Sequence, residues 1–317
     1  MKIVNFLSRI LCNMVAGTLF STSALYSATV FFPPEVVEKH LESYSSQEKE
    51  DIAQDLAVVK SICFGKGIQT QDHPFYLATA GGPGSRKSTI LERFLQSHPE
   101  YSSGVYLDPD QRALKFMPHT YYAQSLNALN TASSFDYLTV VKAAYEKWRG
   151  ASNYITLTLL EEALQNKADV VHGTTLTGAH VPEFLQKLKS EGYRITLILC
   201  SGEDSLRKEA IEYRNNEQRF YQSTPEDAVS KGKFFAEKMS SYFAQADTIY
   251  LYWSDDLFAE EVLAAVFEKG EMRVELGCAL ELFSCKYDQD VKALKAEGKN
   301  FPVWDELVKI YLSRFHP

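Results

Sequence analysis

The residues with the clearest capacity for chemistry lie in the segment "GGPGSRKST", residues 81–89. A glycine at 81 followed by Lys87 and Ser88 has the spacing of a phosphate-binding loop, whose backbone N–H groups and lysine hold phosphates. Lys87 is expected to reach the terminal phosphates of ATP, and Ser88 to hold Mg²⁺. The predicted ATP-binding residues are Gly81, Gly82, Pro83, Gly84, Ser85, Arg86, Lys87, Ser88 and Thr89.

The loop departs from the usual pattern at Arg86, where a glycine normally precedes the lysine. If this position requires a positive φ angle, a side chain there costs about 1 kcal/mol. The guanidinium either crowds the nucleotide or faces outward and adds a charge near the phosphates. A third alternative is a glycine-rich turn that starts a helix and binds nothing. The strand-like run before the loop and the helical pattern after it favour a nucleotide site.

A second group of polar residues follows the next apolar run, in the segment "YLDPDQR". Asp108 and Asp110 are carboxylates, which in a kinase accept the proton of the attacking hydroxyl. The same residues also suit an ordinary turn, because Asp and Pro favour turns. Farther along, "VVHGTT" contains His172, read as a hydrogen-bonded structural residue, and Thr174, the better candidate for a polar contact.

The elements that must position these residues alternate regularly. Short apolar runs that read as strands lie at residues 75–82, 102–108, 168–175, 194–201 and 247–254. Segments of helical periodicity separate them, among them two helices expected at 134–150 and 152–167. This alternation predicts an α/β fold, a parallel sheet with helices on both faces. Ligands of such sheets lie outside the carboxyl ends of the strands, where all three polar groups fall.

Composition and charge exclude some functions. The 317 residues carry a net charge of −8 and are 45% hydrophobic, as in an ordinary globular protein. No stripe of Lys and Arg recurs, so nucleic acid is not an expected partner. The cysteines show no zinc spacing, and the four that follow residue 28 permit disulfides without establishing them.

The N-terminus is distinct from the rest of the chain. Lys2 and Arg9 are followed by no charge until Glu35, and small residues cluster at 21–28. This pattern is typical of a secretory signal peptide, which predicts a secreted or periplasmic protein. A membrane anchor and a buried helix are the alternatives.

Taken in order, the segments "GGPGSRKST", "YLDPDQR", "VVHGTT", "EGYRITLIL" and "ADTIYLYWSDD" resemble the zeta toxin family of P-loop kinases over about residues 73–256. The resemblance implies a P-loop kinase-like fold and an ATP-dependent small-molecule kinase. Well-known members phosphorylate the sugar 3′-hydroxyl of UDP-N-acetylglucosamine and so poison peptidoglycan synthesis. The implied division is a leader at 1–28, a helical segment at 29–72, the kinase domain at 73–256 and a helical extension at 257–317.

The resemblance also implies residue roles. Asp108 would act on the substrate hydroxyl. Its neighbours Asp110 and Arg112, together with Thr174, would bind the substrate. The family's lid arginines, which neutralise charge on the transferring phosphoryl group, fall on the charged helix after residue 202. Candidates there are Arg207, Arg214 and Arg219, with Lys208. Alternatively, these basic residues form a solvated face that pairs with nearby glutamates.

Three functions remain open at this stage. The first is an ATP- and Mg²⁺-dependent kinase of a sugar nucleotide or similar hydroxyl compound, exported as a toxin or effector. The second is a catalytically weakened member of the family that binds a nucleotide or a partner protein. The third is a phosphatase with Asp108 as an aspartyl nucleophile. The sequence leaves the antitoxin or host partner and the acceptor unidentified.

Overall fold

The computed structural model describes residues 29–65, 67–129, 137–217, 221, 223–307 and 309. The chain divides into two units, residues 1–30 and 31–317, and the fold below is that of the second. The predicted leader and Arg219 lie outside the described residues.

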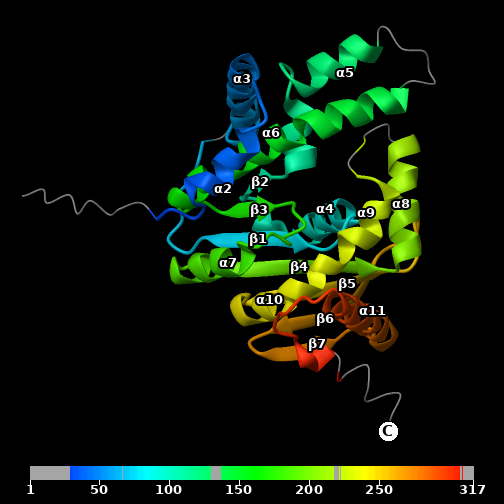
Figure 1. Ribbon diagram of the computed structural model, residues 1–317. Coiled ribbons are helices and arrows are strands. Elements are labelled where there is room, and N and C mark those ends of the chain that lie inside the picture. The colour runs from blue at the N-terminus through cyan, green and yellow to red at the C-terminus, as the bar shows by residue number, and fades with distance from the viewer. Residues whose placement is uncertain are drawn as a thin grey trace, which may run out of the picture. The chain divides into compact units, whose positions relative to one another are not determined.

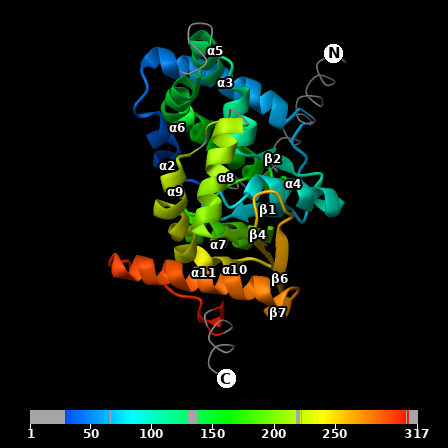
Figure 2. The same ribbon diagram turned by 90° about the vertical axis from the view of Figure 1, so that its right-hand side faces the viewer.

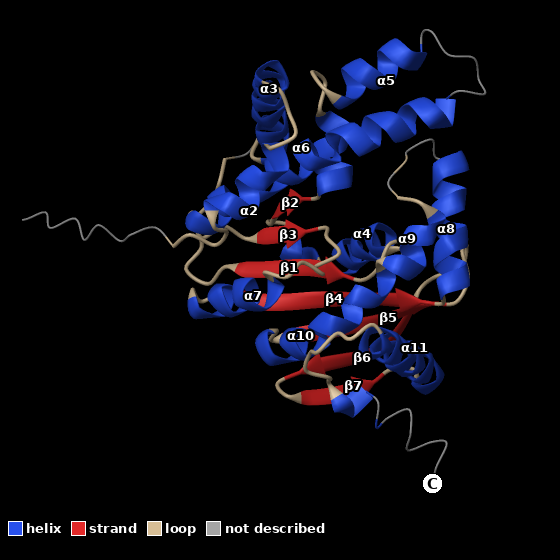
Figure 3. Ribbon diagram, viewed as in Figure 1, coloured by secondary structure: helices blue, strands red, loops and turns tan. Residues whose placement is uncertain are grey.

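The second unit is built on a seven-stranded sheet with the strand order β2-β3-β1-β4-β5-β6-β7 (Figures 1 and 3). β1 to β5 run parallel, and β6 and β7 are antiparallel additions at one edge. The strands are β1 (Phe75–Ala80), β2 (Val105–Leu107), β3 (Val170–His172), β4 (Arg194–Gly202), β5 (Thr248–Ser254), β6 (Val262–Glu268) and β7 (Glu271–Val274). The predicted mostly parallel α/β sheet is therefore confirmed.

The alternation of β1 side chains shows why both faces of this sheet are covered. Tyr76 and Ala78 belong to the larger hydrophobic core, which includes Phe184 of the helix α7 (Val181–Ser190). Phe75 and Leu77 point to the opposite face and join a smaller core with Phe94 of the helix α4 (Lys87–Ser97). Successive side chains of a strand point to opposite faces, so a wholly apolar strand requires cover on both sides.

The helices occupy the connections between strands and both ends of the unit (Figure 1). The α-helices are α2 (Pro34–Glu38), α3 (Ser46–Cys63), α4 (Lys87–Ser97), α5 (Tyr121–Leu129), α6 (Tyr137–Gln165), α7 (Val181–Ser190), α8 (Asp204–Glu217), α9 (Pro225–Ser230), α10 (Met239–Gln245) and α11 (Gly277–Ala296). Short helical turns are η1 (Lys39–Leu41), η2 (Pro99–Tyr101), η3 (Pro109–Ala113), η4 (Leu114–Phe116) and η5 (Gly232–Lys238).

The N-terminal helices are fastened to α6. Tyr44 stacks on Trp148 of α6, with the ring centroids 5.4 Å apart. The buried carboxylate of Asp55 in α3 accepts hydrogen bonds from the backbone N–H of His119 and from the hydroxyl of Thr120. Since α6 also contributes side chains to the site described below, these contacts fix one of its walls.

The structure corrects two sequence-based expectations. The region after Asp255 is not wholly helical, because β6 and β7 form a hairpin that extends the sheet before α11 begins. The two helices expected at 134–150 and 152–167 are one helix, α6, which continues through Gly150.

Two further observations concern membrane-spanning helices and the cysteines. Within the described ranges, no helix has the length and apolar character needed to cross a membrane. Cys63, Cys200, Cys278 and Cys285 are all free thiols. Cys200 is buried, and burial raises the pKa of its thiol to about 12.

Candidate active site

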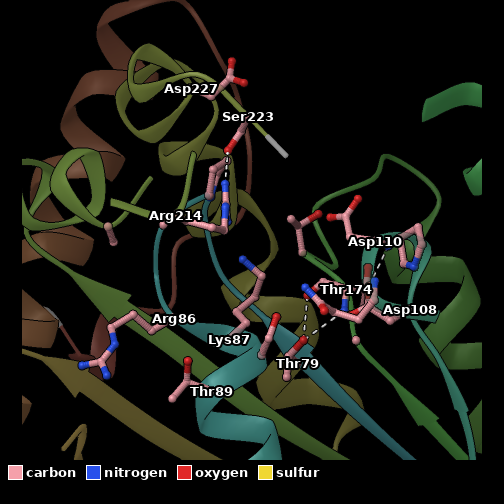
Figure 4. Close-up of a pocket in the computed structure, with 18 of the residues that line it drawn as sticks. Thr79, Arg86, Lys87, Thr89, Asp108, Asp110, Thr174, Arg214, Ser223 and Asp227 are labelled. Atoms are coloured by element: carbon pink, nitrogen blue, oxygen red, sulfur yellow. Dashed lines mark hydrogen bonds between the residues drawn. The ribbon is translucent and has the colours of Figure 1, made fainter. Parts of the chain in front are cut away.

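A pocket of about 770 Å³ opens at the carboxyl ends of the parallel strands (Figure 4). Its floor includes Lys87 after β1, Asp108 after β2 and Thr174 after β3. α6 and α8 supply its side walls, and α8 stands in front of this edge of the sheet in Figure 2. The predicted convergence of the three polar segments is therefore observed in the structure.

The phosphate loop connects β1 to the first residue of α4, which is Lys87. In Figure 4 the lysine side chain extends into the pocket, and its Nζ donates a hydrogen bond to the carbonyl oxygen of Gly82 at 2.7 Å. Burial is the main cause that lowers the pKa of Lys87 to about 8, and the nearby charges of Arg214 and Arg207 contribute. An anion bound at this helix N-terminus would restore the stability of the ammonium form.

The loop is held in shape by its contact with α8. Gly84 has a φ angle of +78°, and a Cβ there would lie 2.2 Å from the carbonyl oxygen of Arg207. Glycine is the residue type that satisfies both requirements, a left-handed backbone and close approach to another chain segment. The glycine-rich composition of the loop therefore has a packing reason as well as a ligand-binding one.

Arg86 has the left-handed backbone conformation that the usual glycine would favour, with φ 58° and ψ 22°. Such a conformation costs a residue with a side chain roughly 1–2 kcal/mol. Its guanidinium donates hydrogen bonds to the carbonyl oxygens of Asp256 and Ala259 at 2.9 and 2.8 Å, and pairs with Glu261 at 2.9 Å. In Figure 4 this side chain points away from Lys87 and Asp110. The guanidinium therefore does not crowd the phosphate loop.

Asp108 is the buried carboxylate of the site. Its Oδ1 accepts hydrogen bonds from the backbone N–H groups of Asp110 and Gln111, each at 2.7 Å, and so caps the turn η3. Burial, followed by the neighbouring charge of Asp110, raises the pKa of Asp108 to about 6. A carboxylate with this pKa is ionised at pH 7 and is a stronger base than an ordinary aspartate.

Asp110 is held by a residue that the sequence did not single out. Arg149 of α6 donates to Asp110 Oδ1 in an ion pair whose side chains are 29% and 22% exposed. Both residues line the pocket, together with Tyr145 and Asn153 of the same helix. The ion pair joins the acidic segment to α6 and orients it toward the cavity.

The two candidate lid arginines on α8 have different positions. Arg214 lines the pocket and donates to the hydroxyl of Ser223 at 3.0 Å (Figure 4). Its Nε is buried and lacks a hydrogen-bond partner within the described part of the chain. Arg214 therefore places a cation at the pocket, as the lid role requires.

Arg207 is instead part of a buried network behind the phosphate loop. It is 4% exposed and pairs with Asp204, which also lies 3.1 Å from Lys286 of α11, and Lys286 in turn pairs with Asp290. Its guanidinium packs on the loop backbone, since a Cβ at Gly82 would lie 2.2 Å from Arg207 Nη1. Arg207 is not among the residues that line the pocket, and its packing supports the loop from behind, while the catalytic role predicted for it stays a prediction.

Two of the three predicted substrate-binding residues line the pocket, namely Asp110 and Thr174. Thr174 is fixed by reciprocal hydrogen bonds with Thr79, at 2.8 and 3.0 Å. The third, Arg112, stacks its guanidinium over the ring of Tyr106 at 4.7 Å and is not among the residues that line the pocket, so its substrate contact stays a prediction. His172 is buried and bonded to the hydroxyl of Tyr76 at 2.7 Å, and burial lowers its pKa to about 3, as expected of a structural residue.

The residues at the pocket fit a magnesium ion that is bound mainly by phosphates. Ser88 is exposed and lines the pocket, and the carboxylates of Asp108 and Asp110 open into the same cavity. Mg²⁺ prefers such oxygen ligands and commonly binds through one or two protein groups plus substrate phosphates. Among the described residues, no cluster of three or more His, Cys, Asp or Glu side chains forms a metal cage.

Comparison with known proteins agrees with this geometry. The model of the family described as Zeta toxin matches residues 63–247, more than half of the chain. The chain belongs to the zeta toxin family. No curated protein matched it.

This zeta toxin family member is similar to a solved structure of the PezAT chromosomal toxin–antitoxin system of Streptococcus pneumoniae, with 16% identity and a TM-score of 0.47. That match covers 86% of this chain and 97% of the other. The AvrRxo1-ORF1:-ORF2 structure with ATP is 14% identical with a TM-score of 0.45, over 77% of this chain and 71% of the other.

The site of this zeta toxin family member includes residues that the sequence did not reveal. They lie on α6, α8 and α9 and directly after α9, and comprise Tyr145, Glu146, Arg149, Asn153, Tyr213, Asp227 and Lys231. No phosphate-loop motif marks them, because a pocket wall formed by helices has only the ordinary helical periodicity. Of these residues, Arg149 is the one that pairs with Asp110.

Proposed function

We propose that the protein is an ATP- and Mg²⁺-dependent kinase that transfers the γ-phosphate of ATP to a hydroxyl of a sugar nucleotide such as UDP-N-acetylglucosamine. The observation that carries this proposal is that Lys87 and Asp108, on loops after different strands, open into one pocket. A kinase requires a cation at the phosphates and a carboxylate at the acceptor, held in one cavity.

The cationic residues of the pocket would bind and orient the triphosphate. The backbone N–H groups of the loop and the N-terminus of α4 favour an anion. Lys87 would exchange its hydrogen bond to Gly82 for the terminal phosphates, and Arg214 would neutralise the charge on the phosphoryl group as it leaves. Mg²⁺, held by Ser88 and the phosphates, would neutralise charge on the β- and γ-oxygens.

Asp108 would act as the general base. Its Oδ1 is engaged by two backbone N–H groups, which fix the orientation of the carboxylate, and its other oxygen would accept the proton. The acceptor hydroxyl transfers its proton to Asp108 as its oxygen bonds to the γ-phosphorus, and ADP leaves. Asp110, paired with Arg149, raises the pKa of Asp108 without competing for the hydroxyl proton.

The outward direction of Arg86 bears on the catalytically weakened alternative. That alternative is motivated by Arg86, by His172 and by the leader, and the first motive is weakened because the Arg86 guanidinium lies against residues 256–261. The loop therefore retains its glycine-like backbone with a side chain turned away, which supports an active rather than a weakened site.

The test is incubation of the full chain with ATP, Mg²⁺ and a panel of sugar nucleotides, followed by mass analysis. We expect one acceptor to gain the mass of one phosphate and ADP to form in equal amount. ATP that binds without turnover of any acceptor would support the weakened alternative, and absence of ATP binding would contradict both.

We propose in addition that the kinase is exported, as a toxin or effector that acts where ATP is plentiful. The motivation is the charge and small-residue pattern of residues 1–28. Mass spectrometry of the native protein would identify its N-terminal residue. A mature chain that starts between residues 22 and 30 supports export, and a chain that retains residue 1 contradicts cleavage.

A further inference from the structure

Arg86 fastens two segments that are distant in sequence. Its Nη1 donates to the carbonyl oxygens of both Asp256 and Ala259, and its Nη2 pairs with Glu261. The side chains of Arg86 and Glu261 are 10% and 2% exposed, so this contact is largely shielded from water. Charge-assisted hydrogen bonds of this kind are worth about twice a neutral one. The segment 255–261, which leads from β5 to β6, is therefore tied to the phosphate loop.

The tied segment is itself a defined turn. Asp256 Oδ1 accepts the backbone N–H groups of Phe258 at 2.7 Å and Ala259 at 3.0 Å. These bonds leave the carbonyl oxygens of Asp256 and Ala259 directed at the Arg86 fork. The turn presents Leu257, between two of the anchored residues, to the pocket.

This part of the pocket wall is apolar, unlike the wall near Asp110. Leu257 lines it together with Ala210 and Tyr213 of α8. The ring of Tyr213 meets that of Phe258 edge-on, with centroids 5.3 Å apart, so the turn also contacts α8. An apolar and aromatic wall beside a phosphate site suits the flat face of a nucleobase.

We propose that Arg86 is a positioning residue, which holds the 255–261 turn against the phosphate loop so that Leu257 and Tyr213 form the nucleobase wall of the ATP site. The proposal rests on the proposed function, because it assigns a part of the same nucleotide site. It explains an arginine at a glycine position. The planar guanidinium can reach two carbonyl oxygens and a carboxylate at once, whereas a glycine provides no such tie.

The test compares ATP with inorganic tripolyphosphate, which offers the phosphates without the base. Calorimetry in Mg²⁺ measures both ligands on the wild-type chain and on Arg86→Gly, whose glycine accepts the left-handed backbone without strain. We expect the Kd for ATP to rise about tenfold, as loss of a hydrogen-bonded charged group predicts, and that for tripolyphosphate to change less than about twofold.

Three further variants separate the wall from other effects. Arg86→Lys keeps the charge and lacks the fork, so we expect the same selective loss of ATP affinity. Arg93→Gln is the matched control, because Arg93 pairs with the other oxygen of Glu261 at 2.6 Å and is 43% exposed. In Arg93→Gln, the Kd of neither ligand should change by more than about twofold. In a Leu257→Ala background, Arg86→Gly should raise the Kd for ATP by less than about twofold. The reason is that the effects of two mutations that remove the same contact are not additive.

Several outcomes would overturn the inference. If Arg86→Gly lost equal affinity for ATP and for tripolyphosphate, and Arg86→Lys restored that affinity, Arg86 would supply charge to the phosphates. Equal wild-type affinity for the two ligands would mean that no base wall exists, while nucleotide binding itself would stand. A wild-type chain that binds neither ligand would contradict the proposed function and this inference with it.

Discussion

Asp108 and Gly173 lie in such close contact that a Cβ at position 173 would stand 2.1 Å from Asp108 Oδ2. Gly173 follows β3, and its N–H donates to the carbonyl oxygen of Leu107, the residue before Asp108. The end of β3 therefore fixes the position of the carboxylate that we assign as the base.

Gly173→Ala should consequently displace the Asp108 carboxylate. A displacement of about 1 Å at a reacting group costs roughly a hundredfold in rate, and we expect a fall in kcat of that order. Steady-state kinetics with the accepted sugar nucleotide would measure it. Gly192→Ala is the control, because Gly192 has φ +83° and open space around it. That change should cost about 1 kcal/mol of stability and leave kcat unaltered. Equal kcat in wild type and Gly173→Ala would argue against Asp108 as base.

Asp108→Asn should abolish turnover and increase stability. The pKa of Asp108 is raised from 3.8 to about 6, so ionisation at neutral pH costs the folded state free energy. This cost is absent below the unfolded pKa, grows as the pH rises through the window from 3.8 to about 6, and is fully present above it. At pH 7 the amide should raise the free energy of unfolding by about 1 kcal/mol or more.

Urea denaturation would measure this stability change, and calorimetry should show unchanged ATP affinity. Asp110→Asn is the informative comparison, because it leaves Arg149 without its carboxylate partner and should lower stability by about 1 kcal/mol. A destabilised Asp108→Asn variant would contradict the assigned burial cost.

The value of kcat/KM should fall at both acid and alkaline pH. Protonation of Asp108, with a pKa of about 6, removes the base, and deprotonation of Lys87, with a pKa of about 8, removes a phosphate ligand from the free enzyme. The logarithm of kcat/KM should therefore rise with unit slope below the first value and fall above the second. Residual activity of Lys87→Arg should lack the alkaline limb, since arginine stays charged. A profile that is flat over both values would refute these assignments.

Replacement of Arg207 by methionine and replacement of Arg214 by methionine should have different effects on stability and on kcat. Arg207→Met breaks a buried network with Asp204 and should cost about 3 kcal/mol of stability. Arg214→Met should change stability by less than about 1 kcal/mol and lower kcat by about a hundredfold or more, because it removes a cation from the transferring phosphoryl group. Thermal unfolding and kcat together distinguish the two roles, and a stable but inactive Arg207→Met would reverse them.

The sequence predicts well the part of the site that depends on the local conformation of the backbone. Gly84 must have a positive φ angle and Lys87 must begin a helix, so their spacing carries the loop geometry. Asp108 could be placed for a similar reason, because it caps the turn directly after a strand.

Arg207 and Arg214 show what spacing cannot provide. They lie seven residues apart, nearly two helical turns, so both point to the same side of α8. Only tertiary packing decides that Arg207 lies against Gly82 and Gly232 while Arg214 faces the pocket. Long flexible side chains on one helix face carry no local signal of their partners.

Two errors in secondary structure also have physical causes. Gly150 was read as the end of a helix, yet α6 continues because Tyr44 packs there, with its hydroxyl 3.0 Å from where a Cβ would lie. The β6–β7 hairpin falls in the region after about Asp255 that the sequence analysis expects to be helical. Its signal was the Lys269-Gly270 pair, whose positive φ angles of 54° and 83° form the two-residue turn of a hairpin.

The most direct test of the central claim is transfer of radiolabelled γ-phosphate from ATP to UDP-N-acetylglucosamine, with wild type, Lys87→Ala and Asp108→Asn compared at equal concentration. We predict labelled sugar nucleotide with the wild type, at least a hundredfold less with either variant, and ATP affinity retained in Asp108→Asn. Label that appears on the acceptor at wild-type rate with Lys87→Ala or Asp108→Asn would contradict the account.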